Sequence, residues 1–446
     1  MLNKKIGAPA VGALAFAVAS ASAIAAEGPV EEVVVTGSYI KRLSQEDSIS
    51  PITNLGRAEI DNTGILTNQE LIRWLPSNTG SENQADALTQ GTTLGTANIN
   101  LRGLGLGSTL VLINGRRQTV SSASANGGDT FVDINSLMPM IMMENVEILK
   151  DGAAAIYGSD AVAGVANYKT RDDFRGLEIR GDWQATDRGD DHEDRSVQAI
   201  FGTDNGAGTS LVAGFSYFKR EGFFLGERNF PRNTVSSFGQ PGSYLLTAPP
   251  TTGVPGTPGV FNADPDCTVA TGTFVAPDGQ GGELCFFDFG PSYSLVPDET
   301  RTQFYAVAEH SVSDFLNLRG EFGYSQNDIE GGYSPSFPFL NFAPIEADHP
   351  GNPWETPVLA RTRVVGDGLG APGSGRVINK ADHETTRFVL AADGELGVGN
   401  WAYDLSFTRS RNDLNGTGVD QSLSRVIASL QGFGGVNCDV VNGTAG

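Results

Sequence analysis

Residues 315–328 read FLNLRGEFGYSQND, and apolar and polar side chains alternate along this stretch. In an extended chain, one face would carry Leu316, Leu318, Phe322 and Tyr324. The opposite face would carry Asn317, Arg319, Glu321 and Ser325. A soluble β-sandwich also alternates, but strands in a membrane β-barrel need about 9–11 tilted residues, and this stretch is long enough. It therefore favours a membrane-spanning strand with one apolar and one polar face.

The same alternation recurs along the chain after residue 177. Leu177, Ile179 and Trp183 share one face of an early segment, and Trp401, Tyr403, Leu405 and Phe407 share one face of a late one. The predicted strands are 177–187, 195–203, 209–221, 300–310, 316–329, 384–394 and 400–413. Short turns (204–208, 311–315, 395–399) alternate with long excursions (222–299, 330–383). Short periplasmic turns and long external loops are typical of outer-membrane barrels, and a sandwich gives no reason for this sorting.

Seven strands do not complete a barrel. Single-chain bacterial barrels have even strand numbers, and an open sheet would leave backbone groups unpaired in hydrocarbon. We therefore expect the wall to continue beyond Gly446. The cysteines agree with this expectation, because Cys267 and Cys285 lie in one Gly/Pro-rich segment and are expected to close a loop, which leaves Cys438 over. Its partner would lie beyond Gly446, and a free surface thiol is the alternative.

The N-terminus predicts export. Lys4 and Lys5 precede an apolar, small-residue stretch from Ala8 to Ala26, with a cleavage site expected after Ala25 or one residue later. A membrane anchor helix is the alternative, but alanine-rich stretches span poorly. Soon afterwards comes EEVVVTGSYI (31–40), a β-forming valine run with no turn or partner strand beside it.

Residues 40 to about 175 predict a compact α/β region. Short strands are expected at 50–56, 145–152 and 164–170, and residues 98–105 are expected to form a strand that runs into a glycine turn. A hairpin is expected at 109–120 around Asn114-Gly115. Thr67 and Glu70 have capping-box spacing at the start of a helix that Pro76 ends. A second, short helix is expected at 153–158.

Composition and motifs narrow the function. The chain has 57 Gly among 446 residues and a formal charge of −22, which argues against nucleic acid as a partner. The glycines of RGLGLGS (102–108) precede a strand, whereas a dinucleotide site needs a helix there. Neither a catalytic constellation nor metal-ligand spacing stands out, so the sequence predicts no enzyme, no cofactor and no metal site.

The ordered set of motifs resembles the TonB-dependent outer-membrane receptors. The segments that carry the resemblance are EEVVVTGSYI (31–40), LIRWLPS (71–77), NINLRGLG (98–105), LVLINGRR (110–117), VDINSLMP (132–139) and VEILKDGAAAIYGSDAVAGVANYKT (146–170). The resemblance implies a mainly β fold: a small α/β plug inside an antiparallel transmembrane barrel, with seven of about 22 strands present. The expected regions are a signal peptide (1–25), a periplasmic segment (26–44), the plug (45–173) and the first part of the barrel (174–446), with external loops at 222–299, 330–383 and 414–446.

The resemblance also implies partners and site residues. Residues 31–38 resemble the TonB box, and the residues expected to bind TonB, which acts with ExbB and ExbD, are Glu32, Val33, Val34, Val35, Thr36 and Gly37. The alternative is that this segment starts the plug sheet. Ion pairs between plug and wall are expected from Arg102, Arg116, Arg117, Glu144, Glu147 and Lys150, and ordinary solvated charges are the alternative for each.

The predicted function is energy-coupled import of a scarce nutrient across the bacterial outer membrane, whose lipid would surround the barrel. A passive porin is disfavoured because it needs neither plug nor TonB box. A surface ligand-binding or adhesion protein is the other alternative. The polar stretches 78–97 and 119–130 suit a hydroxyl-rich ligand such as an oligosaccharide or a peptide, and siderophores are another class that relatives carry. The sequence does not identify the substrate-binding residues.

Overall fold

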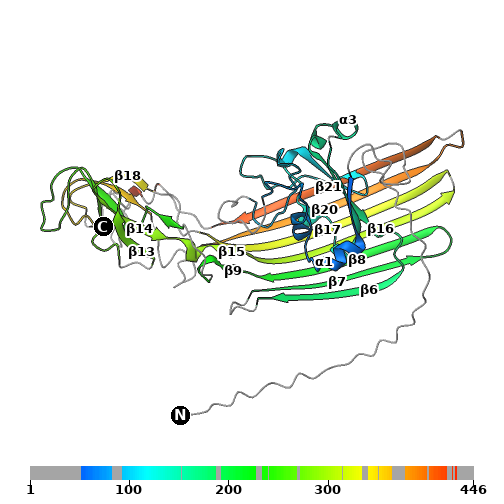
Figure 1. The fold of residues 1–446 in the computed structure, drawn as a ribbon, viewed down its shortest axis with the longest axis horizontal. Coiled ribbons are helices and arrows are strands. Elements are labelled where there is room, and N and C mark those ends of the chain that lie inside the picture. The colour runs from blue at the N-terminus through cyan, green and yellow to red at the C-terminus, as the bar shows by residue number, and fades with distance from the viewer. Residues whose placement is uncertain are drawn as a thin grey trace, which may run out of the picture.

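The computed structural model describes residues 52–82, 93–151, 153–186, 192–227, 234–239, 241–268, 272–313, 315–333, 340–349, 351–363, 377–398, 401–418, 424 and 427–428. The predicted signal peptide, the segment 31–38 and Cys438 lie outside these residues. Within them, the chain forms a small plug, a long twisted sheet and a group of short sheets beyond one end of it (Figure 1).

The plug is built around a five-stranded sheet with the order β1-β4-β5-β2-β3. Its strands are β1 (Ile52–Gly56), β2 (Thr109–Ile113), β3 (Arg116–Arg117), β4 (Met143–Leu149) and β5 (Gly164–Thr170). Its α-helices are α1 (Arg57–Thr63), α2 (Asn68–Arg73) and α3 (Ala154–Tyr157). The parallel pair is β2 with β5, and the other neighbours are antiparallel.

Local signals explain most of these elements. The Thr67 hydroxyl accepts a hydrogen bond from the Glu70 amide at 3.3 Å, which caps α2 as predicted. Asn114 and Gly115 have φ values of 51° and 76°, the left-handed pair that a tight hairpin turn requires. The predicted strand at 98–105 is wrong. Its backbone makes only an isolated bridge, between Leu101 and Asn78, and then turns through Arg102 and Gly103, which also have positive φ.

The long sheet, which we call the wall, contains seven antiparallel strands in the order β21-β20-β17-β16-β8-β7-β6. They are β6 (Gly176–Ala185), β7 (Glu193–Asp204), β8 (Thr209–Glu221), β16 (Asp298–Ser313), β17 (Leu316–Tyr333), β20 (Val377–Glu395) and β21 (Ala402–Thr417). These strands confirm all seven predicted ones. Within the part of the chain that the structure describes, the sheet ends at β6 and β21 and does not close.

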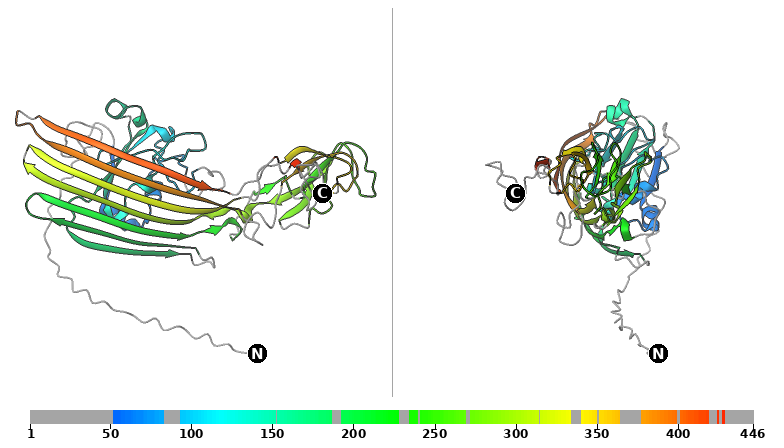
Figure 2. Two further views of the ribbon diagram at one scale, coloured as in Figure 1. Left: turned by 180° about the vertical axis from the view of Figure 1, so that it is seen from behind. Right: turned by 90° about the vertical axis from the view of Figure 1, so that its left-hand side faces the viewer.

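The two faces of the wall differ as the alternation predicts. Leu177, Ile179 and Trp183 are about two-thirds exposed on the outer face, as are Leu405 and Phe407. The inner face carries polar and charged side chains and curves around the plug (Figure 2). A water-soluble protein has an apolar interior and a polar exterior. The wall has the opposite arrangement, which suits a sheet that is surrounded by lipid.

The two long excursions fold together. A four-stranded sheet has the order β12-β11-β19-β18 and joins β11 (Ser243–Leu246) and β12 (Phe261–Ala263) of the first excursion to β18 (Leu340–Ile345) and β19 (Val358–Thr362) of the second. Beside it lies a three-stranded sheet of β10 (Val235–Ser236), β14 (Glu283–Asp288) and β13 (Thr273–Pro277). A further pair joins β9 (Phe223–Phe224) to β15 (Ser294–Val296). We call β10 to β14 with β18 and β19 the external module; it projects beyond the long-loop end of the wall (Figure 1).

Candidate functional site: the plug–wall interface

Arg319 on β17 is the centre of a charged cluster between plug and wall. Its guanidinium donates to Asp172 of the plug at 2.7 Å and to Glu321 of its own strand at 2.7 Å. It also pairs with Glu309 on β16. The Arg319 side chain is 12% exposed and Glu321 is fully buried, so these charges are largely shielded from solvent. Buried charges of this kind depend on their partners to remain ionised.

Glu321 extends this cluster to the plug hairpin. It accepts hydrogen bonds from the Tyr305 hydroxyl at 2.7 Å and from Asn114 Nδ2 at 3.1 Å. Arg387 on β20 donates to the Arg117 carbonyl at 2.6 Å. The hairpin at Asn114 is therefore held against two adjacent wall strands, β17 and β20.

Asp172 illustrates the electrostatic balance at this seam. Burial raises the pKa of its carboxyl, while the Arg319 guanidinium and a hydrogen bond from Thr170 oppose the shift. Because the charged form of Asp172 depends on Arg319, the two side chains form one unit that links plug and wall.

A second set of charges holds α1 and α2. Arg220 on β8 donates to Asp194 at 2.8 Å and lies 3.8 Å from Glu70 on α2. Arg180 on β6 pairs with Asp61 on α1 at 3.0 Å. A hydrogen bond from Arg57 lowers the pKa of Asp61, which keeps this carboxylate charged for the wall.

The end of the plug nearer the long loops is held by uncharged contacts. Asn327 Nδ2 donates to the Gly95 carbonyl at 2.9 Å, and His383 Nε2 lies 2.8 Å from the Leu94 carbonyl oxygen. Gln303 Nε2 donates to the Asn135 carbonyl at 2.9 Å. Side chains from three wall strands thus contact backbone carbonyls of the plug here, rather than plug side chains.

Asp133, in the VDINSLMP motif, organises this end of the plug. Its Oδ1 accepts from the amides of Ala97 and Asn135, both at 3.0 Å. Burial raises the pKa of this carboxyl, and His383 and Arg301 of the wall oppose the shift. The motif therefore positions the plug backbone whose carbonyls, at Leu94, Gly95 and Asn135, contact the wall.

Gly95 gives a direct test of how closely plug and wall fit. A Cβ atom at this residue would lie 1.5 Å from Ile329 Cδ1, and its φ is +83°. We expect Gly95→Ala to cost about 1 kcal/mol for the left-handed backbone and about 1–3 kcal/mol for the overlap. The measurement is the thermal unfolding midpoint of the purified protein in detergent.

Gly128→Ala is the matched control for this substitution. Gly128 has a φ of +84°, but nothing lies within 4 Å of an added Cβ atom. It should therefore show only the backbone cost, and adding Ile329→Ala to Gly95→Ala should recover the cost of overlap. An equal effect of the two glycine substitutions would show that plug and wall are not in close contact at Gly95.

Among the six residues predicted to form ion pairs between plug and wall, Arg116 has a wall partner, because it lies 3.3 Å from Asp404 on β21. Three others form ion pairs with plug residues: Arg117 with Asp160 at 2.6 Å, Glu147 with Lys169, and Glu144 with Arg171 at 3.9 Å. Arg102 donates to the Ala163 carbonyl at 3.1 Å, and Lys150 follows β4 half-buried.

Sequence reasoning missed Arg319, Glu321 and Asp172. The sequence places Arg319 and Glu321 on the polar face of a predicted strand, and this position was the signal that could have identified them. A charged residue on the inward face of a membrane wall needs a partner in the lumen, and this rule would have singled them out.

The external module contains the disulfide between Cys267 and Cys285. Both cysteines are fully buried, and the module packs a second small core around Trp354, Tyr244 and Leu246. The bridge closes a loop with a sequence separation of 18 residues.

We expect loss of this bridge to loosen the external module but not the wall. Constraining a loop of this length contributes roughly 3 kcal/mol. In a Cys438→Ser background, Cys267→Ser with Cys285→Ser should speed proteolysis of the module on intact cells. A reducing agent should have the same effect on the bridged protein and no further effect on the double variant. Equal proteolysis rates with and without the bridge would contradict this expectation.

No helix in the described residues is long and apolar enough to cross a membrane. Among the same residues, no group of three or more His, Cys, Asp or Glu side chains is placed to hold a metal ion.

Comparison with known proteins agrees with this architecture. Residues 44–165 match the family model for the TonB-dependent receptor plug domain. An iron-regulated outer membrane virulence protein of Vibrio cholerae is 36% identical over 78 residues, which are 18% of this chain and 12% of that protein. The vitamin B12 transporter BtuB of Vibrio vulnificus is 30% identical over 140 residues, or 31% of this chain and 20% of that protein. The matches thus span a fifth or less of these relatives.

Among solved structures, the chain is similar to a mutant of the ferric enterobactin receptor PfeA from Pseudomonas aeruginosa in complex with enterobactin. Identity is 14%, the TM-score is 0.43, and the match covers 81% of this chain and 41% of that one. Residues 44–165 therefore resemble the plug domain of TonB-dependent receptors, and the curated relatives that the chain matches include an outer membrane protein. The matched proteins whose names state an activity are a vitamin B12 transporter and a ferric enterobactin receptor.

Proposed function

We propose that the chain is part of a transporter that imports a scarce nutrient across the outer membrane and whose plug gates the lumen. The observation that carries this proposal is that the plug packs against the polar inner face of the wall. A plug in this position blocks passive flow. Its charged and backbone contacts at Arg319, Arg220 and Asn327 are of a kind that water can replace when the plug moves.

Transport of this kind needs an external energy source, and the segment 31–38 supplies a contact for one. An extended valine run can add a strand to the sheet of a partner through backbone hydrogen bonds. We propose that Glu32, Val33, Val34, Val35, Thr36 and Gly37 bind TonB, which transmits energy from ExbB and ExbD in the inner membrane.

The nutrient is proposed to be a small, hydroxyl-rich ligand. The plug segment 119–130 presents Ser, Thr, Asn and Asp side chains, which suit an oligosaccharide or a peptide. Two relatives are named for iron regulation and vitamin B12 transport, so iron complexes of siderophores and cobalamins belong in the test panel as well.

The test is nutrient uptake by a deletion strain that carries the full-length gene. A panel of carbon, peptide, iron and cobalamin sources identifies a nutrient whose uptake the gene restores. We expect a protonophore, which collapses the inner-membrane proton gradient, to abolish that uptake without preventing surface binding. Uptake that resists the protonophore would instead indicate a passive porin, and binding without any uptake would indicate a surface-binding protein.

A further inference from the structure

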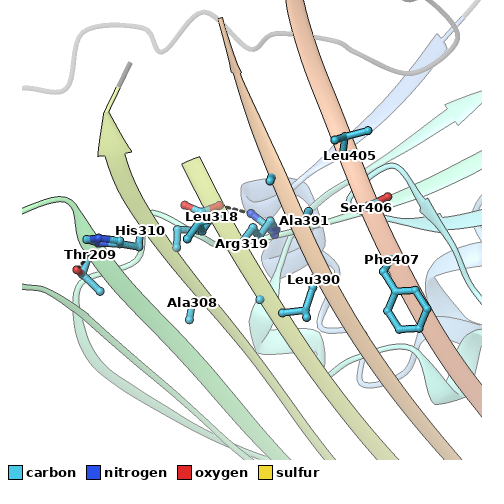
Figure 3. Close-up of a pocket in the computed structure, with 13 residues that line it drawn as sticks. Thr209, Ala308, His310, Leu318, Arg319, Leu390, Ala391, Leu405, Ser406 and Phe407 are labelled. Carbon is cyan, nitrogen blue, oxygen red and sulfur yellow. Dashed lines mark hydrogen bonds and ion pairs between the residues drawn. The ribbon is translucent and has the colours of Figure 1, made fainter. Parts of the chain in front are cut away.

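The outer face of the wall contains a hollow close to the short turns. It encloses about 650 Å³ and is bordered by strands β8, β16, β17, β20 and β21. In Figure 3, Ala308, Leu390 and Phe407 lie along it on β16, β20 and β21, and plug elements are visible behind the sheet. The hollow therefore opens away from the plug, on the side where Leu390 and Phe407 are exposed.

Small residues at matched positions create this hollow. Ala308 and Gly320 are direct partners across β16 and β17, and Ala392 follows on β20, opposite Leu318. Nothing lies within 4 Å of a Cβ atom built at Gly320, so the floor is open rather than filled by neighbouring side chains. Larger apolar residues then form the sides, since Leu390 pairs with Gly320 on one side and with Phe407 on the other.

The hollow has a polar end. Thr209 Oγ1 and His310 Nδ1 lie 2.8 Å apart in the row of residues nearest the short turns. The other members of that row, Leu318, Ala392 and Leu405, are apolar. The site is thus a groove with an apolar body and a hydrogen-bonding edge, which matches the two ends of a lipid molecule.

We propose that this groove holds an acyl chain of a phospholipid from the periplasmic leaflet, with the headgroup near Thr209 and His310. The groove is continuous with the apolar face that the wall presents to the membrane, so lipid is the occupant already in contact with it. Short turns mark the periplasmic side of an outer-membrane barrel, which selects the phospholipid leaflet. Since lipid tails are as apolar as the groove, retention comes from close van der Waals packing in the hollow.

This proposal rests on the outer-membrane location and is independent of import. The alternative occupants are a second copy of the receptor and unordered lipid that samples the whole outer face equally. The same experiment separates the three.

Gly320→Phe fills the groove, and Gly181→Phe is the matched control. Gly181 lies on the outer face of β6, where an added Cβ atom meets nothing closer than 4.0 Å. Full-length receptor is reconstituted in phospholipid vesicles that contain a diazirine-labelled acyl chain. It is then irradiated, and the labelled peptides are measured by mass spectrometry.

We expect labelling of peptides from β16, β17 and β20 near the groove to exceed labelling elsewhere on the outer face. Gly320→Phe should reduce that labelling by about fivefold or more, and Gly181→Phe should leave it unchanged. Equal labelling along the whole outer face, or no change with Gly320→Phe, would overturn the proposal. A change of oligomeric state with Gly320→Phe would point to a second copy instead. We expect nutrient uptake by Gly320→Phe to be unaltered, which would show that the loss of labelling does not result from loss of transport.

Discussion

Val34→Pro should reduce nutrient uptake to the level of the deletion strain while leaving ligand binding intact. Proline has no amide hydrogen, so a strand that contains it cannot complete a ladder of hydrogen bonds with TonB. Among the described residues, the first plug strand is β1 at Ile52, so the substitution lies outside the described plug core. Because the proposed contact with TonB would be the route by which energy reaches the receptor, we expect the largest functional effect of any single substitution in the chain. The measurement is uptake of the restored nutrient at equal receptor abundance.

Two controls separate loss of the TonB contact from loss of fold. Val34→Thr keeps the amide hydrogen and the β preference, so uptake should persist. Ser44→Pro introduces the same constraint beyond the valine run, and uptake should again persist. Loss of binding together with uptake in Val34→Pro would support the other interpretation, in which this segment starts the plug sheet. Normal uptake by Val34→Pro would falsify the TonB-box assignment.

Arg319→Leu should weaken docking of the plug more than any other wall substitution. It leaves the carboxylates of Asp172 and Glu321 without their main cation in a shielded site. Removing one partner of a buried pair typically costs about 3–5 kcal/mol. We expect a lower thermal unfolding midpoint and faster proteolysis of the plug in the purified full-length receptor. Cells should also become more sensitive to a large hydrophilic antibiotic, because a loosened plug lets it leak through the lumen.

The matched control is Arg411→Leu. Arg411 pairs with Asp413 at 2.6 Å on β21, but its side chain is 74% exposed. A solvent-exposed ion pair contributes little to stability, so this variant should behave like the parent protein. Adding Asp172→Asn to Arg319→Leu should restore part of the lost stability, because it removes one of the uncompensated charges. Indistinguishable unfolding of the two arginine variants would show that the Arg319 cluster does not hold the plug.

Local chemistry predicted the elements of this fold well. The alternation in residues 315–328 places Leu318 and Phe322 outward and Arg319 and Glu321 inward, as the structure shows. The turn at Asn114-Gly115 and the cap at Thr67 are equally local, since each depends on residues within a few positions. At 98–105 the predicted glycine turn is present, but the predicted strand before it is not, because the positive φ at Arg102 and Gly103 turns the chain after a single isolated bridge at Leu101.

The sequence predicted that ion pairs join plug and wall, but it did not identify which residues pair. Arg116 and Asp404 are 288 residues apart, and Arg319 and Asp172 are 147 apart. The sequence marks each of them as charged, but nothing local states which charge faces which. Arg117 shows the consequence, because it looks equivalent to Arg116 and yet pairs with Asp160 inside the plug.

The sequence by itself determined that this chain forms outward-apolar strands joined by short turns on one side and long loops on the other. That follows because side chains alternate between the two faces of a strand, and because the number of residues between strands gives the length of each turn. Only the tertiary structure decided how Asp172 meets Arg319, how two distant loops share the sheet of β11 and β19, and where Ala308 and Gly320 leave a hollow. Each of these depends on strand register and on contacts between segments remote in the chain, which local patterns do not encode.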